Sequence, residues 1–363
     1  MEKVFDAHIH HTFDIPLEEA IAIFKAEFQE TGTVAGVFLS CPHHSDGEKL
    51  YVDELQNVKT LCLKHAFSGS YAYAALVHSQ GMTDTTEERL SREYLRQAQE
   101  YVAAGFDGIK MLEGYPSMRK AMGRSLCSPV YDRFYGYLEE NGIPITLHLG
   151  NPKEYWDAEN APEEAFRQGR VCDGTYPTKE QLAEEAEGIM KKFPALRLTL
   201  AHFGFMSYDI GQADRWLNDH PNTRFDITPG GEQLLNMRKS WSEWERFFID
   251  HQDKIVYGSD YYAFPHDEKW EENYSRRPRF LRQFFETDEE HVYLGETFRG
   301  VNLDPSILKK IYGENAKREL GTPKPIDLKY IKREAERLLA ESDKRSLTDK
   351  LDLAYILQIS SGS

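Results

Sequence analysis

Short apolar runs alternate with amphipathic helical segments along the first 285 residues or so of the chain. The run over residues 34–39 is apolar throughout, as expected of a strand buried on both faces of a parallel sheet. The segment over residues 87–104 carries apolar residues at helical spacing, and they form one stripe: Leu90, Tyr94, Ala98 and Tyr101. This alternation predicts a parallel sheet with helices outside it, in close to eight strand–helix units.

Such units predict an α/β fold of the (β/α)8 TIM-barrel class over residues 1–321. A doubly wound open sheet is the alternative, but it brings only neighbouring strand ends to its crevice. Residues 322–363 are charged with a helical pattern, so we expect a C-terminal helical extension packed on the barrel or on a partner subunit. Within the barrel, residues 178–181 form a capping-box pattern, and one helix is predicted over residues 232–250.

Polar residues stand where the predicted strands end. His8 and His10 lie two apart on the first strand, so their side chains point to the same side and can meet at one metal ion. Later strands end in His148, His202 and Asp260. A single buried histidine at a strand end is explained by hydrogen bonding alone. Four histidines and an aspartate at the same end of one barrel instead predict a metal site.

His8, His10, His148 and Asp260 offer three nitrogens and one oxygen, a set that binds zinc, manganese or iron. Such an ion lowers the pKa of its bound water toward neutrality, and Asp260 can then act as the general acid/base. His202, one strand further round, is expected either to bind the ion or to polarise a substrate oxygen. The predicted cofactor is therefore a divalent metal, with zinc as the first choice.

In these residues the chain resembles the amidohydrolase superfamily, and within it the amidohydrolase-related branch of metal-dependent hydrolases and non-oxidative decarboxylases. The resemblance extends to about residue 321. It rests on an ordered set of short segments: residues 6–10, 105–112, 147–148, 201–204, 257–261 and 311–316. It implies the barrel, a metal held by His8, His10, His148 and Asp260, and His202 beside the substrate.

The end of the fourth predicted strand leaves the number of metal ions open. Some members of the superfamily carry there a carboxylated lysine or a glutamate that bridges two ions, and this chain has Lys110 and Glu113. On strict alternation these two side chains face opposite sides of the strand, so at most one is expected to reach the metal. With Glu113 as a bridging ligand, His202 also becomes a ligand, whereas with one ion His202 acts as an electrophile.

Arg119 and His44 are candidates for substrate binding, because both follow predicted strand ends. The planar guanidinium of Arg119 matches two oxygens of a carboxylate or phosphate. Residues 151–177 form a longer connection than a compact domain needs, which is typical of lids and binding segments.

The expected reaction is hydrolysis of a C–N or C–O bond in a small polar substrate, carboxylated or not, by metal-activated water. Decarboxylation of a small carboxylated substrate by the same residues is the alternative, and the motifs do not separate the two. A catalytically inactive barrel that acts as a binding protein is a third hypothesis. The retention of four histidines and Asp260 argues against it.

The composition and charge restrict the kinds of molecule that the protein is expected to bind. A formal net charge of −16 argues against nucleic acid and anionic membranes, which attract basic patches. No apolar run approaches the roughly 20 residues that span a bilayer, and no targeting pattern opens the chain. The 4 cysteines lie far apart, which indicates free thiols in a reducing cytoplasm. We therefore expect a cytoplasmic enzyme with a small-molecule substrate and, by family analogy, a homo-oligomeric state.

Overall fold

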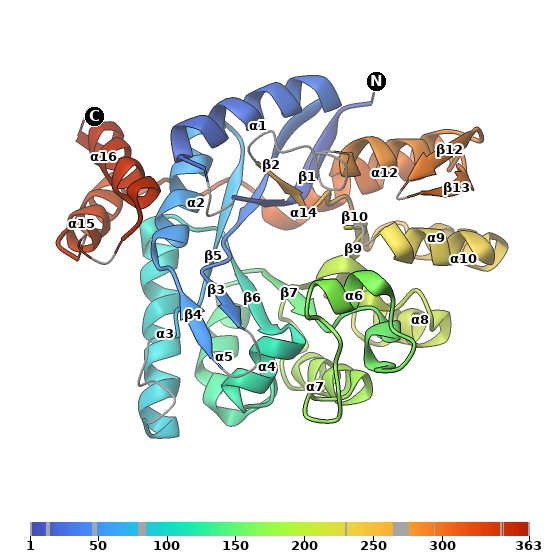
Figure 1. Ribbon diagram of the computed structural model, residues 1–363, viewed down its shortest axis with the longest axis horizontal. Helices are drawn as coiled ribbons and strands as arrows, with labels where there is room; N and C mark the ends of the chain where they lie inside the picture. Colours follow the sequence, from blue (N-terminus) through green and yellow to red (C-terminus); the bar gives the residue numbers. More distant parts are fainter. Residues whose placement is uncertain are drawn as a thin grey trace.

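In the computed structural model, one parallel sheet curls into a barrel at the centre of the molecule (Figure 1). The structure describes residues 2–11, 15–45, 49–78, 85–228, 231–263, 276–293, 295–341, 343 and 345–361. In these ranges the sheet has nine strands in the order β10-β9-β8-β7-β6-β5-β2-β1-β11. They are β1 (Val4–His10), β2 (Thr33–Leu39), β5 (Tyr71–Ala75), β6 (Gly108–Gly114), β7 (Ile145–Leu149), β8 (Leu198–Leu200), β9 (Thr223–Asp226), β10 (Ile255–Val256) and β11 (Tyr261–Tyr262).

The two edge strands of this order follow each other along the chain, so the sheet closes on itself. β10 pairs with β9, and β11 pairs with β1 through His10 and Tyr262. Between β10 and β11, the amide of Asp260 donates a hydrogen bond to the carbonyl of His8 at 2.9 Å. β10 and β11 therefore act together as the eighth strand, and the predicted (β/α)8 barrel is confirmed.

Helices cover the outside of the barrel and follow the strands in sequence (Figure 1). They are α1 (Leu17–Thr31), α2 (Leu55–Ala66), α3 (Glu87–Ala104), α4 (Pro116–Met122), α5 (Asp132–Glu140), α7 (Lys179–Lys192), α8 (Ile210–Asp219), α9 (Gly231–Lys239), α10 (Trp241–Asp250) and α12 (Arg277–Glu286). α3 buries the predicted stripe, and Thr178 forms the predicted capping box at α7. The prediction of one helix over residues 232–250 is wrong, because Ser240 leaves the helical conformation between α9 and α10.

Several connections between strands and helices contain short elements of their own. A hairpin of β3 (His43–Ser45) and β4 (Leu50–Val52) follows β2. Residues 151–177 contain the 3-10 helix η2 (Lys153–Trp156) and α6 (Glu163–Arg167), so this predicted lid has secondary structure of its own. Its two ends are joined by the indole of Trp156, which donates to the carbonyl of Pro177 at 2.9 Å. Other short elements are the 3-10 helices η1 (Pro129–Tyr131) and η3 (Ala201–Phe205) and the hairpin of β12 (Glu290–Tyr293) and β13 (Glu296–Arg299).

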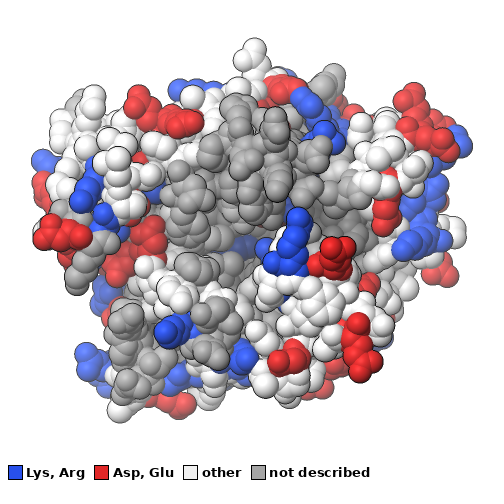
Figure 2. All heavy atoms as spheres, in the orientation of Figure 1, with Lys and Arg blue, Asp and Glu red and all other residues white. Residues whose placement is uncertain are grey.

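The chain ends in helices that pack outside the barrel. They are α13 (Pro305–Lys309), the π-helix η4 (Lys310–Glu314), α14 (Asn315–Leu320), α15 (Leu328–Leu339) and α16 (Leu347–Ser361). α15 contacts α2 and α3, and α16 contacts α1 and α2. None of the described helices combines the length and the apolar character that a membrane crossing needs. Acidic and basic side chains are interspersed over the face in view (Figure 2).

Candidate metal centre

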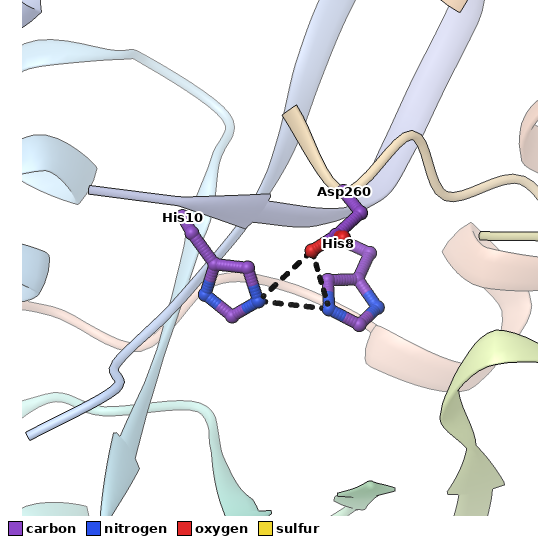
Figure 3. Close-up of side chains that lie close together, drawn as sticks. All are labelled: His8, His10 and Asp260. Atoms are coloured by element: carbon purple, nitrogen blue, oxygen red, sulfur yellow. Dashed lines mark hydrogen bonds and ion pairs between the residues drawn. The ribbon is translucent and has the colours of Figure 1, made fainter. Parts of the chain in front are cut away.

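His8, His10 and Asp260 converge where the barrel strands end (Figure 3). The Nε2 atoms of the two histidines lie 2.9 Å apart. Oδ1 of Asp260 lies 3.6 Å from Nε2 of His8 and 3.4 Å from Nε2 of His10. All three side chains are buried. Within the described ranges, no other group of three or more histidines, cysteines and acids is compact enough to share an ion.

The other ring nitrogen of each histidine is held by an acceptor. Nδ1 of His8 donates to Oδ2 of Asp226 at 2.7 Å, and Nδ1 of His10 donates to the carbonyl of Leu39 at 2.8 Å. Burial lowers the pKa of both imidazoles well below the ordinary value, so both rings are neutral. A neutral ring with its proton on Nδ1 has a bare lone pair on Nε2.

Three electron-pair donors of buried side chains therefore face one another: two imidazole nitrogens and one carboxylate oxygen. Such an arrangement is repulsive unless a cation lies between the donors. Neutral imidazoles with their second nitrogen tied to a carboxylate or a carbonyl are the usual form of histidine metal ligands. The donor set therefore fits a divalent metal ion such as zinc.

Two cations border this ligand group. Nζ of Lys110 lies 3.4 Å from Nε2 of His8. Nη1 of Arg277 donates to Oδ2 of Asp260 and, at 2.9 Å, to the carbonyl of the same residue. Burial raises the pKa of Asp260, and the charges of Arg277 and Lys110 oppose that shift. One oxygen of Asp260 is thus fixed by Arg277, while the other is turned toward the histidines.

Glu113 does not join the ligand group, contrary to the expectation from the superfamily. Its Oε1 pairs with Nε2 of His78 at 2.7 Å, away from His8 and His10. This placement agrees with the predicted alternation, because Lys110 and Leu112 line the cavity and Glu113 does not. Of the two candidates on this strand, Lys110 reaches the site.

His148 and His202 lie on the wall of the same cavity, with ring centroids 4.7 Å apart. Nε2 of His148 donates to the carbonyl of Gly150 at 3.0 Å, which leaves the lone pair of the neutral ring on Nδ1. The ring of His202 lies 5.2 Å from that of His8. Burial lowers the pKa of both rings well below the ordinary value. The structure brings both residues to the site, beside the compact group of three.

A cavity of about 430 Å³ opens in front of the ligands. Tyr155 and Arg170 of the connection over residues 151–177 line it. Among the described lining residues, Lys110, Arg170 and Arg277 are cations and Asp260 is the one carboxylate. This charge balance favours an anionic ligand.

The structure shows the position of the Arg119 side chain but not that of His44, the other predicted substrate-binding residue. Arg119 lies on α4, where its guanidinium donates to the carboxylate of Glu185 on α7 at 2.8–3.2 Å. It lines a separate hollow with Lys120 and Thr175, so the structure does not bring it to the cavity. The reason is that α4 turns this side chain toward α7. The backbone of His44 is part of β3, and its side chain lies outside the described part of the structure.

Three residues of the site were not identified from the sequence patterns. Asp226 ends β9, so the rule that found the histidines at strand ends could also have found it. Arg277 lies on α12 and follows no local pattern. Cys41 lines the cavity with Sγ 3.2 Å from Nδ1 of His10, and burial raises the pKa of its thiol to about 12.

Comparisons with known proteins agree with this fold and show the family. The family model described as Amidohydrolase matches residues 69–322. An uncharacterised TIM-barrel protein, Bb4693 from Bordetella bronchiseptica, is similar in structure with a TM-score of 0.56 at 13% identity, over 88% of this chain and 98% of the other. Dihydroxybenzoic acid decarboxylase from Polaromonas sp. JS666, with bound manganese and an inhibitor, has a TM-score of 0.50 at 14% identity, over 88% and 97%. No curated protein matches the sequence.

Proposed function

Because the chain belongs to the amidohydrolase family, we propose that it is a metal-dependent hydrolase of a C–N or C–O bond in a small polar substrate. One observation carries the proposal: the bare Nε2 atoms of His8 and His10 face each other and Oδ1 of Asp260 inside the protein. His148 is proposed to complete the set through Nδ1. We propose zinc as the resident ion; manganese and iron accept the same ligands.

A divalent ion in this position supplies Lewis acidity, which acidifies water and polarises a substrate oxygen. The protein's own part is to move the proton. Asp260, whose Oδ2 is held by Arg277, takes a proton from the attacking water and returns it to the leaving nitrogen or oxygen. The neutral ring of His202 hydrogen-bonds the substrate oxygen in this proposal as the C–N or C–O bond breaks.

A second candidate, non-oxidative decarboxylation, is favoured by the cations that line the cavity. Lys110, Arg170 and Arg277 suit a substrate carboxylate. In this reaction carbon dioxide leaves, the electron pair of the broken C–C bond stays on the substrate carbon, and Asp260 delivers a proton to that carbon. Both reactions use the same residues and differ in whether water is consumed.

The first test is elemental analysis of the purified protein. We expect about one divalent ion per chain in wild type, and loss of that ion in His8→Ala and His10→Ala. Glu113→Ala and His65→Ala, the latter a change of an exposed histidine on α2, should keep the ion. No metal in wild type, even after reconstitution with zinc or manganese, would refute the proposal.

The second test separates the two reactions. The metal-loaded protein is incubated with small amides, esters and aromatic acids that carry carboxylates, and the products are analysed. Hydrolysis adds one water to the substrate, and its products carry ¹⁸O when the reaction runs in H₂¹⁸O. Release of carbon dioxide with deuterium incorporation from D₂O at the vacated carbon would instead identify the decarboxylase.

A further inference from the structure

The turn that carries His202 is left-handed. In η3 the φ angles of His202, Phe203 and Phe205 are 55°, 54° and 51°. Residues with side chains avoid this region, so a run of them needs compensating contacts. The amide of His202 donates to Oδ1 of Asp226 at 2.7 Å, and its carbonyl accepts from Nε2 of Gln233 at 2.5 Å. These two bonds hold the backbone of His202 from both sides.

Asp226 hydrogen-bonds both to the ring of His8 and to the backbone of the turn that carries His202. Its Oδ1 accepts from the amide of His202, from the amide of Thr228 at 3.2 Å and from the hydroxyl of Thr228. Its Oδ2 accepts from Nδ1 of His8 at 2.7 Å. The residue is 1% exposed, so water does not compete for either oxygen. One carboxylate thus links a metal ligand on β1 to the strained turn after β8.

We propose that Asp226 is a positioning residue: it fixes the proton of His8 on Nδ1, and thereby sets the metal affinity, while it holds His202 in the left-handed turn. The inference rests on the proposed function, because the Nε2 lone pair of His8 matters only if that atom binds a metal. The bonds to His8 and to His202 come from different oxygens of Asp226, so one substitution can separate them.

Asp226→Asn is that substitution. Three donors surround Oδ1, so they select the amide oxygen of the asparagine for that position. The amide nitrogen then replaces Oδ2 and points its hydrogens at Nδ1 of His8. Two donors cannot bond each other, so His8 must move its proton to Nε2. The turn of His202 keeps its acceptor, but the metal site loses its first nitrogen ligand.

The experiment uses the full chain without metal, labelled with ¹⁵N-histidine. Long-range ¹H–¹⁵N NMR spectra report the tautomer of His8, and loss of its signals in His8→Gln assigns them. We expect the Nδ1–H tautomer in wild type and the Nε2–H tautomer in Asp226→Asn. Competition titration with a chelator should then show zinc affinity lower by 10- to 100-fold in Asp226→Asn.

Gln233→Leu is the matched control. It removes the other bond to His202 without a contact to His8, so it should keep the wild-type tautomer and zinc affinity. The inference is overturned if wild type shows the Nε2–H tautomer, and this measurement does not depend on the folding of any variant. A wild-type zinc affinity in Asp226→Asn also overturns it. If wild type binds no zinc but the tautomer changes from Nδ1–H to Nε2–H in Asp226→Asn, the proposed function and the affinity claim are refuted, and Asp226 is confirmed as the residue that sets the tautomer.

Discussion

The Nε2 atoms of His8 and His10 lie 2.9 Å apart, and both present lone pairs because both Nδ1 atoms donate to other residues. A cation that binds these lone pairs in the folded chain should therefore stabilise the protein. We predict that chelation with EDTA lowers Tm and that zinc restores it. At free zinc 1,000 times above Kd, binding adds about 4 kcal/mol to the free energy of unfolding. Thermal unfolding followed by circular dichroism measures the change.

The control is the same comparison of Tm values, after EDTA and after zinc, on His10→Ala. This variant lacks one of the two facing nitrogens, so zinc should leave its Tm nearly unchanged. Equal Tm values for metal-free and zinc-treated wild type would contradict the prediction.

His148 should matter less for metal binding than His10. It lies on the cavity wall beside the compact ligand group, and its free Nδ1 is the proposed fourth ligand atom. We predict that His148→Ala weakens zinc binding, and that His10→Ala weakens it at least about tenfold more, because His10 belongs to the compact donor group and His148 does not. Competition titration gives both constants, with His65→Ala as the unaffected reference. A larger loss in His148→Ala would place the ion deeper in the cavity.

Local sequence patterns predicted those features of the fold and the site that depend on residues close together in the chain. The period of two on β1 placed His8 and His10 on one side, and the ends of the barrel strands brought His148, His202 and Asp260 toward them. The (β/α)8 barrel followed from the alternation of strands and helices. These features need no knowledge of packing, because strand ends of a closed parallel barrel share one opening.

The sequence could not supply features that depend on distant elements. Alternation on β6 separates Lys110 from Glu113, but it does not tell which of the two lies at the site, and the structure has Glu113 against His78 and Lys110 beside His8. Arg277 reaches Asp260 from α12, a helix with no sequence pattern that ties it to the metal site. Arg119 looked suited to a substrate, but its partner Glu185 lies on α7. Such pairings are fixed only when the helices pack.

The buried Lys179 should make the stability of the protein depend on pH. Its Nζ donates to the carbonyl of Asn151 at 2.8 Å, and burial lowers the pKa of its ammonium group to about 7. The unfolded chain keeps this proton up to about pH 10. Between these values the unfolded state binds more protons, so the free energy of unfolding rises with pH.

We therefore predict that wild type gains about 2 kcal/mol relative to Lys179→Met between pH 7 and pH 9. Urea denaturation of both proteins at the two pH values measures the difference. Because the two chains share every other titrating group, the comparison isolates Lys179. A difference that stays constant from pH 7 to pH 9 would mean that Lys179 keeps its proton in the folded state throughout this range.

The C-terminal helix α16 is tied to the barrel by a buried ion pair. Nζ of Lys59 on α2 lies 2.5 Å from Oδ2 of Asp352, and both side chains are almost fully buried. The other oxygen of Asp352 accepts from the amide of Leu17, the first residue of α1, at 2.6 Å. Asp352→Asn leaves the buried Lys59 only the more distant carboxylate of Asp349, at 3.9 Å, so it should lower the free energy of unfolding by about 3 kcal/mol.

Glu187→Gln is the matched control for this last change. Its carboxylate pairs with Lys191 on the surface of α7, so its loss should cost less than about 0.5 kcal/mol. Urea denaturation gives both values, and zinc affinity should be unchanged because neither residue lies at the metal centre. If Asp352→Asn costs no more than Glu187→Gln, α16 does not contribute to the stability of the barrel through this pair. A large cost would instead show that residues 322–363 fold together with the barrel, since α16 then supplies the counter-charge for a lysine inside it.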